Sequence, residues 1–226
     1  MAMYKLVIFD CDGVLVDSEM IANRIDAEAL TAIGYPITAE ESIKQFVGMS
    51  TKSVCEKILN ESGCQISPHF FSEQQTAVLE AFKIELCSLI EPVLEFLTAQ
   101  SIMRCVASSS SKERIFRSLE ITDQIRFFET KAIFSSQQVS RGKPAPDLFL
   151  LAANQMGCAP AECLVIEDSS AGIQAALTAG MDVVGFMGGS HAGYDWYQQK
   201  VIPYDIPMVY HQNELLEWIK KHFLSS

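Results

Sequence analysis

Asp10 and Asp12 are two carboxylates separated by a single residue, and Gly13 follows them directly. Carboxylate oxygens are ligands that hard cations such as Mg²⁺ prefer, and a carboxylate can also act as a nucleophile. The preceding residues 4–9 form a short apolar run, which is typical of a fully buried strand. The pair therefore falls at the carboxyl end of a predicted strand, where open α/β sheets bind ligands. Taken alone, the pair is equally compatible with a solvated loop.

Two later segments carry groups that can bind an anion. Ser108 and Ser109 follow a predicted strand over 102–107 and precede a predicted helix, so they can cap that helix or bind a phosphate. Lys143 stands directly before Pro144, which biases it toward an extended conformation. An ammonium group held in this way can balance a phosphate and a carboxylate, although a solvated surface lysine is the alternative.

Glu167 and Asp168 form a second acidic pair after a predicted strand over 163–166. Oxygen ligands from two strand ends suit Mg²⁺, with water and a substrate phosphate completing its octahedral coordination. Acidic residues at a helix N-terminus can instead interact with the helix dipole. The order of acidic pair, serine, lysine and acidic pair, each at a strand end, favours one shared site over separate coincidences.

The elements that must position these residues alternate between strands and helices, which predicts an α/β fold with a doubly wound, Rossmann-like parallel sheet. The predicted strands cover residues 4–9, 102–107, 132–134, 163–166, 182–186 and 208–210. Because the carboxyl ends of parallel strands meet at one edge of the sheet, the four segments are expected to lie close together.

Residues 18–90 break this alternation and are predicted to be entirely helical. Ser18 is expected to cap a first helix that ends at Gly34, and the last helical run covers 68–88. We therefore predict a core domain made of residues 1–17 and 91–226, with an inserted all-α domain at 18–90. Both ends of the insertion fall near the predicted site, so it is expected to act as a cap or lid.

Composition excludes several classes of protein. The net charge of −11 argues against nucleic acid or an anionic membrane as a partner, and no apolar run is long enough to cross a membrane. No secretory signal is expected, and the seven cysteines include no C-x-x-C pair. A reducing, cytoplasmic setting is therefore predicted, and a zinc site is not.

With these motifs in place, the chain resembles the haloacid dehalogenase superfamily, subfamily I, whose members carry a helical cap after the first motif. The resemblance implies a phosphatase that hydrolyses a small sugar phosphate or phosphorylated sugar acid through an aspartyl-phosphate. It assigns Asp10 as the nucleophile and Asp12 as the general acid and base, a choice that the residues alone leave open. Ser108, Ser109 and Lys143 would bind the transferring phosphoryl group.

The resemblance also implies a Mg²⁺ ion as cofactor. Its ligands would be the Asp10 side chain, the backbone carbonyl of Asp12 and Asp168, with Glu167 binding directly or through water. The partner of the protein would be a small phosphorylated metabolite, and a monomer or weak dimer is expected.

Substrate specificity is expected in the helical insertion, which would cover the leaving group. Candidate substrate contacts are Arg24, Gly48 and Lys52, and a cationic pair there would suit a phosphorylated sugar acid such as 6-phosphogluconate. His191 follows two glycines that predict a flexible loop. It is a further candidate substrate contact, with an ordinary loop histidine as the alternative.

The main alternative activity is that of a β-phosphoglucomutase, which returns the phosphoryl group to the sugar. Mutases of that type carry a histidine and an arginine in the cap, where this chain has Ala22 and Thr51. That difference favours hydrolysis. A non-catalytic sensor of phosphorylated ligands is a second alternative, but it would not need the second acid, Asp12.

Overall fold

The computed structural model describes residues 4–46 and 51–223 and divides the chain into two compact units. The core unit joins the residues up to Asp17 with those from Cys87 onward, and the helical unit is Ser18–Leu86. No helix in the described ranges is long and apolar enough to cross a membrane.

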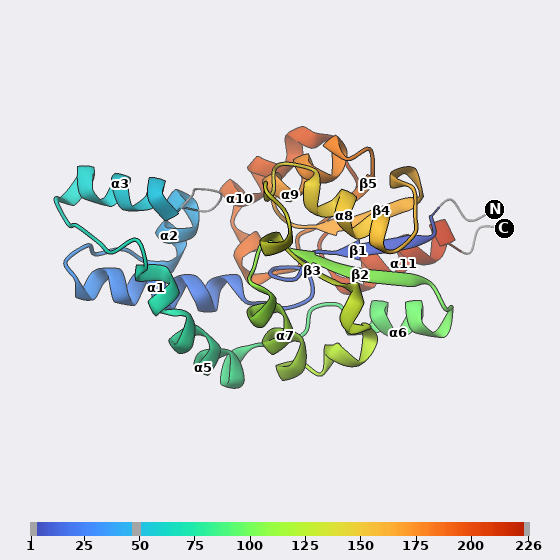
Figure 1. The fold of residues 1–226 in the computed structure, drawn as a ribbon, viewed down its shortest axis with the longest axis horizontal. Coiled ribbons are helices and arrows are strands. Elements are labelled where there is room, and N and C mark those ends of the chain that lie inside the picture. Colours follow the sequence, from blue (N-terminus) through green and yellow to red (C-terminus); the bar gives the residue numbers. More distant parts are fainter. Residues whose placement is uncertain (1–3, 47–50, 224–226) are drawn as a thin grey trace. The chain divides into compact units, whose positions relative to one another are not determined.

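A six-stranded parallel sheet forms the centre of the core unit (Figure 1). Its spatial order is β3-β2-β1-β4-β5-β6, which confirms the predicted α/β fold with a doubly wound sheet. The strands are β1 (Leu6–Phe9), β2 (Met103–Ser108), β3 (Ile133–Ser135), β4 (Cys163–Glu167), β5 (Asp182–Phe186) and β6 (Met208–Val209).

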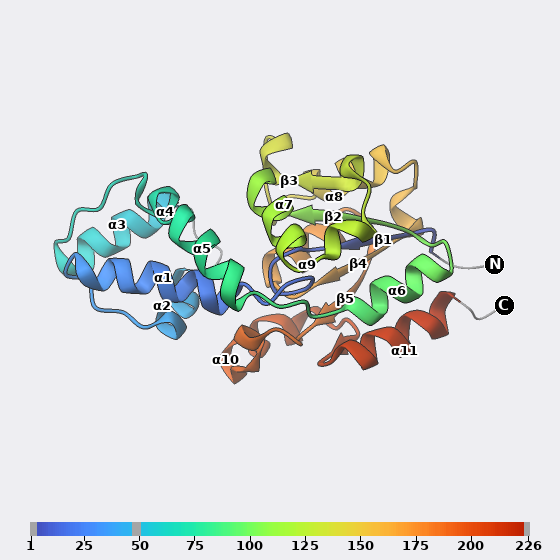
Figure 2. The same ribbon diagram turned by 90° about the horizontal axis from the view of Figure 1, so that it is seen from below.

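Helices cover both faces of the sheet. On one side, α8 (Asp147–Gln155) and α9 (Ser170–Thr178) contact each other and the strands beneath them. On the opposite side lie α6 (Glu91–Ala99) and α7 (Lys112–Ile121), and α11 (Gln212–Phe223) packs against α6 (Figures 1 and 2). Because both faces are covered, β1 and β4 are buried at every position, which explains why both are apolar up to Glu167, the last residue of β4.

Serine side chains cap the N-termini of two helices that follow strands. The Ser111 hydroxyl accepts a hydrogen bond of 3.2 Å from the Arg114 backbone N–H at the start of α7. The Ser169 hydroxyl likewise accepts one of 3.1 Å from the Gly172 backbone N–H at the start of α9. These caps satisfy otherwise unpaired N–H groups and fix the path by which the chain leaves β2 and β4.

The helical unit consists of helices around its own small core. Its helices are α1 (Glu19–Ala32), α2 (Ala39–Phe46), α3 (Thr51–Ser62), α4 (Phe70–Glu73) and α5 (Gln75–Glu85). The buried core side chains are Leu30, Phe46, Val54, Ile58, Ile66 and Phe70. Apolar residues at helical spacing thus pack against one another within this unit, as is typical of amphipathic helices.

Three local features differ from the sequence prediction. The Ser18 side chain does not cap α1. The predicted helix over 68–88 is divided at Gln74 into α4 and α5 and ends at Glu85. After it the chain returns to the core unit, where the Leu89 N–H donates to the Leu15 carbonyl at 3.0 Å. Residues 87–90 therefore belong to the core unit rather than to the insertion.

Two leucines of α8 test how much the packing of this helix stabilises the core unit. Leu148 is fully buried, whereas Leu150 is 40% exposed. Leu148→Ala is expected to lower the free energy of unfolding by about 2–5 kcal/mol, because it leaves a cavity. Leu150→Ala should lower it by less than about 1 kcal/mol. Urea unfolding followed by circular dichroism measures both values, and equal losses would contradict the packing described for α8.

Candidate active site

Three acidic side chains converge at the carboxyl ends of β1 and β4. Asp10, Glu167 and Asp168 each place one carboxylate oxygen within 4.8 Å of the others, and all three residues are buried. The register of the sheet brings them together, because the Asp10 N–H donates to the Ile166 carbonyl at 3.0 Å. The two acidic pairs seen in the sequence thus meet at one edge of the sheet.

Lys143 joins two members of this acidic cluster, Asp10 and Glu167. Its Nζ atom is 2.6 Å from Asp10 Oδ1 and 2.6 Å from Glu167 Oε1, and its side chain is only 4% exposed. The ammonium group also lies 4.8 Å from the centre of the buried Phe149 ring on α8. Lys143 is therefore a buried cation bound by two carboxylates and not a solvated surface lysine.

Burial and charge shift the protonation equilibria of these groups in opposite directions. Burial raises the pKa of Asp10 well above its ordinary value, and the Lys143 charge opposes that rise. Burial also raises the pKa of Glu167, again against the effect of Lys143. Burial alone would lower the pKa of Lys143, but the two carboxylates outweigh it and raise that pKa. Lys143 is thus a charged group that pairs with two of the three acids, and its single positive charge cannot balance the whole cluster.

Glu167 is held through both of its carboxylate oxygens. Oε1 binds Lys143, and Oε2 accepts hydrogen bonds from the N–H of Ser169 at 2.8 Å and from its hydroxyl at 3.0 Å. Gly172 packs so closely that a Cβ atom there would lie 1.7 Å from Oε1. Glu167 is therefore fixed in place as a partner of Lys143 as well as a member of the acidic cluster.

Asp12 makes its contacts with residues that follow β2. Its Oδ2 accepts a hydrogen bond of 2.6 Å from the Ser110 hydroxyl, and its Oδ1 lies 2.8 Å from Nη2 of Arg114. The Arg114 side chain is 18% exposed, so this ion pair is partly shielded from water. Sequence reasoning missed Arg114. The sequence signal that could have identified Arg114 is its position, three residues after the Ser111 cap and in the first turn of α7.

The serine-rich loop after β2 is held by the last residue of β3 and by the residue that follows it. The Ser135 hydroxyl donates to the Ser110 carbonyl at 2.6 Å, and the Ser136 hydroxyl donates to the Ser109 carbonyl at 2.7 Å. Ser108 is 1% exposed, and its hydroxyl accepts a hydrogen bond from the Ser110 N–H at 3.1 Å. The loop therefore has a defined conformation, with Ser109 exposed at the surface of the core unit.

The predicted substrate contacts of the insertion belong to the helical unit. Arg24 on α1 pairs with Glu28 at 3.3 Å and with Glu85 at 2.6 Å. Gly48 lies outside the described residues, and Lys52 falls in the first turn of α3, with its side chain also outside the description. A role for these residues in substrate binding stays a prediction.

His191 lies against the acidic cluster. The segment predicted as a flexible loop contains a short 3₁₀ helix, η5 (Ser190–Gly193), and the His191 ring is 1% exposed. Its Nε2 atom is 2.7 Å from Asp168 Oδ2, and the Tyr197 hydroxyl lies 3.4 Å from the same oxygen. The histidine is thus a buried neighbour of Asp168, and Tyr197 is a further residue that the sequence did not reveal.

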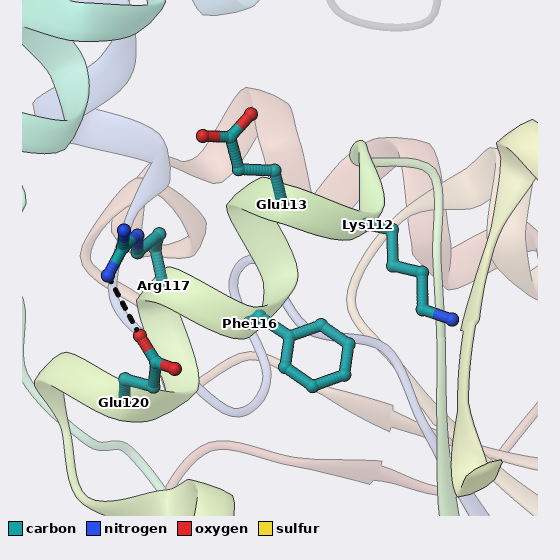
Figure 3. A pocket seen from close by; sticks show the side chains of 5 residues that line it. All are labelled: Lys112, Glu113, Phe116, Arg117 and Glu120. Atoms are coloured by element: carbon teal, nitrogen blue, oxygen red, sulfur yellow. Dashed lines mark hydrogen bonds and ion pairs between the residues drawn. The ribbon is translucent and has the colours of Figure 1, made fainter. Parts of the chain in front are cut away.

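A surface hollow on α7 is lined by none of the candidate site residues (Figure 3). Its lining side chains all project from this one helix, and an ion pair of 3.2 Å between Arg117 and Glu120 crosses part of it. They are Lys112, Glu113, Phe116, Arg117 and Glu120. The convergence of charged groups at the sheet edge, and not this hollow, forms the candidate active site.

Known proteins share both the sequence pattern and the fold of this chain. A sequence profile of the family described as haloacid dehalogenase-like hydrolase matches residues 7–186. The 6-phosphogluconate phosphatase of Escherichia coli strain K12 is 29% identical over 198 residues, covering 84% of this chain and 86% of that protein. The β-phosphoglucomutase of Bacillus subtilis strain 168 is 33% identical over 197 residues, covering 80% and 82% of the two chains.

A solved structure supports the same comparison. The crystal structure of a haloacid dehalogenase-like protein of unknown function from Agrobacterium tumefaciens superposes with a TM-score of 0.82 and 32% sequence identity. The match covers 96% of this chain and 97% of that one. The likeness therefore extends over nearly the whole chain.

Removing the buried cation tests the charge balance of the cluster. In metal-free protein, Lys143→Met is expected to lower the free energy of unfolding by about 3–5 kcal/mol near neutral pH, because it leaves buried carboxylates without a partner. The pKa values of Asp10 and Glu167, already raised by burial, would rise further in the folded variant. The folded state would then bind more protons than the unfolded state above about pH 4, so stability should fall as pH rises.

Urea unfolding in EDTA at about pH 5 and about pH 8 measures this dependence. Lys131→Met is the matched control, because the Lys131 side chain is 82% exposed. If the stability that Lys143→Met loses relative to wild type is no larger at the higher pH than at the lower pH, the charge balance is wrong.

Proposed function

The chain belongs to the haloacid dehalogenase-like hydrolases and is a phosphatase, and on this premise we propose the finer assignment of a Mg²⁺-dependent phosphomonoester hydrolase. Its substrate would be a small sugar phosphate or phosphorylated sugar acid, and the reaction would pass through a phosphoryl group on Asp10. The observation that most supports this is the buried Lys143, which joins Asp10 to Glu167 beside Asp168.

The chemistry of the acidic cluster fits a divalent cation. Three buried carboxylates face a single ammonium group, and hard oxygen donors at this spacing are those that Mg²⁺ binds. Asp10, Asp168 and the backbone carbonyl of Asp12 would hold the ion. Glu167 already uses both oxygens in hydrogen bonds, which favours a contact through water. When bound, Mg²⁺ would neutralise the repulsion between the Asp10 carboxylate and the substrate phosphate.

Asp10 is the proposed nucleophile. One of its oxygens would attack phosphorus, forming an aspartyl-phosphate while the bond from phosphorus to the substrate oxygen breaks. Lys143 holds the Asp10 carboxylate at 2.6 Å and offers the positive charge that the transferring phosphoryl oxygens need. Ser108 and the backbone N–H of Ser109 would bind those oxygens at the end of β2.

Asp12 would move the protons of both half-reactions. It would give a proton to the leaving alcohol and then take one from the water that attacks the aspartyl-phosphate. Its hydrogen bond from Ser110 and its ion pair with Arg114 restrict the orientation of the carboxylate. A fixed orientation of the Asp12 carboxylate supports its proposed role in proton transfer.

Two similar enzymes support a phosphorylated sugar or sugar acid as the proposed substrate class. One relative is a 6-phosphogluconate phosphatase, and another is a β-phosphoglucomutase. The mutase is therefore the second candidate. Two residues argue against the mutase. The chain has Ala22 and Thr51 at the positions where the resemblance places the histidine and arginine of mutases. Hydrolysis remains the activity that we propose.

Replacing the nucleophile tests the proposal. Asp10→Asn should reduce Mg²⁺-dependent phosphate release by at least about a thousandfold, because an amide oxygen is a poor nucleophile toward phosphorus. The substrates would be 6-phosphogluconate, phosphoglycolate, several sugar phosphates, nucleoside monophosphates and β-glucose 1-phosphate. Asp195→Asn at the exposed start of α10 (Asp195–Val201) is the matched control and should keep full activity.

Three results would count against the proposal. A substantial residual activity in Asp10→Asn would show that Asp10 is not the nucleophile. Conversion of β-glucose 1-phosphate to glucose 6-phosphate without phosphate release would identify a mutase. Binding of phosphorylated ligands without turnover of any compound would identify a sensor.

A further inference from the structure

His191 forms a buried pair with Asp168, and the proposed reaction gives this histidine no part. The two residues are 1% and 3% exposed, and the imidazole Nε2 atom lies 2.7 Å from Asp168 Oδ2. Tyr197 packs edge-on against the imidazole, with ring centres 4.7 Å apart, and directs its hydroxyl toward the same carboxylate oxygen. A carboxylate with a hydrogen-bond donor at this distance in a buried setting has little freedom to rotate.

The space around the pair is closed by two glycines from different loops. A Cβ atom on Gly13, after β1, would lie 2.2 Å from Asp168 Oδ2 and 2.8 Å from His191 Cε1. A Cβ atom on Gly189, after β5, would lie 2.8 Å from the same imidazole carbon. Any side chain at these positions would have to displace the pair. The backbone at Gly13 therefore lies close against both groups, and the backbone at Gly189 lies close against the imidazole.

The element that carries His191 is itself anchored to the core unit. The N–H and the hydroxyl of Ser190 both donate to Asp17 Oδ1, at 3.0 Å and 2.8 Å. The side-chain amide of Gln198 on α10 donates to the Ala192 carbonyl at 3.0 Å. His191 is thus held on a short 3₁₀ helix with contacts on both sides, which sets the imidazole in a fixed position relative to Asp168.

The carboxylates of the acidic cluster need such restraint because they repel one another. Asp10 and Glu167 are held by Lys143. Asp168 does not contact Lys143 within ion-pair distance in the described residues, and its hydrogen bonds come instead from His191 and Tyr197. Both of those bonds go to Oδ2, so Oδ1 is the oxygen left to bind a cation. Carboxylates that bind metals are commonly fixed by outer hydrogen bonds of this kind.

We infer that His191 is a positioning residue of the metal site, whose Nε2–H group fixes the Asp168 carboxylate in the orientation that binds Mg²⁺. This inference rests on the proposed function, because it takes Asp168 to be a ligand of the ion. It replaces the substrate contact that the sequence suggested for His191. The imidazole acts through Asp168 and takes no part in the transfer of the phosphoryl group.

Mg²⁺ binding to the full-length, metal-free protein tests the inference without relying on activity. Isothermal titration calorimetry with MgCl₂ would compare wild type, His191→Phe and His191→Gln. Phenylalanine keeps a ring but removes the donor, and the dissociation constant should rise by about 10–100-fold. The amide N–H of glutamine can reach the place of Nε2, so this variant should keep most of the affinity. His69→Gln alters an exposed histidine of the helical unit and should bind as wild type does.

The outcomes separate the inference from the proposed function. A dissociation constant for His191→Phe within about twofold of wild type would overturn the inference, since lost outer hydrogen bonds typically cost tenfold or more. An equal loss in His191→Gln would also overturn it, because the donor would then not be the cause. Wild-type protein that neither binds Mg²⁺ nor releases phosphate would instead refute the proposed function. If the phenylalanine variant fails to fold, His191→Asn, whose shorter amide does not reach Oδ2, takes its place.

Discussion

The mutual repulsion of three buried carboxylates is the constraint on which the rest of this structure depends. Asp10, Glu167 and Asp168 are all buried, and the ammonium group of Lys143 balances part of their charge. Such a cluster is costly to bury unless its members are paired and hydrogen-bonded. Much of the surrounding architecture supplies these partners. Lys143 comes from the segment before α8, Ser169 from the start of α9, and His191 from the chain after β5.

The parallel sheet explains how residues so far apart in sequence supply one site. The parallel strands of the core unit end at the same edge, so the loops that follow neighbouring strands begin close to one another. The loops are then fixed by contacts with their neighbours. Ser135 and Ser136 hold the loop after β2, and Asp17 holds the 3₁₀ helix after β5. The rigid sheet determines where each side chain starts, and these local bonds determine where it points.

The sequence predicted those features that depend on local pattern. Apolar runs located all six strands, because a strand covered on both faces has almost no polar positions. Three of the four charged or polar motifs directly follow such a run, whereas Lys143 lies in the segment between β3 and α8 and not at the strand end that was predicted for it. Contacts that depend on the tertiary path were not predictable in the same way. Arg114 meets Asp12 across 102 positions of the chain, and His191 meets Asp168 only because Gly13 and Gly189 leave room for both. No short sequence pattern predicts either contact, because the order of the strands in the sheet determines which residues meet.

The central claim is that Asp10 forms a covalent bond to the phosphoryl group, and chemical trapping tests it most directly. The protein would be mixed with Mg²⁺ and a sugar phosphate that it hydrolyses, quenched in acid and treated with borohydride, which reduces an aspartyl-phosphate to homoserine. Peptide mass spectrometry would then locate the change. The proposed mechanism predicts homoserine at position 10 and at no other acidic residue of the cluster. A reduced residue at Asp12 or Asp168, or turnover without any trapped phosphoenzyme, would contradict the account.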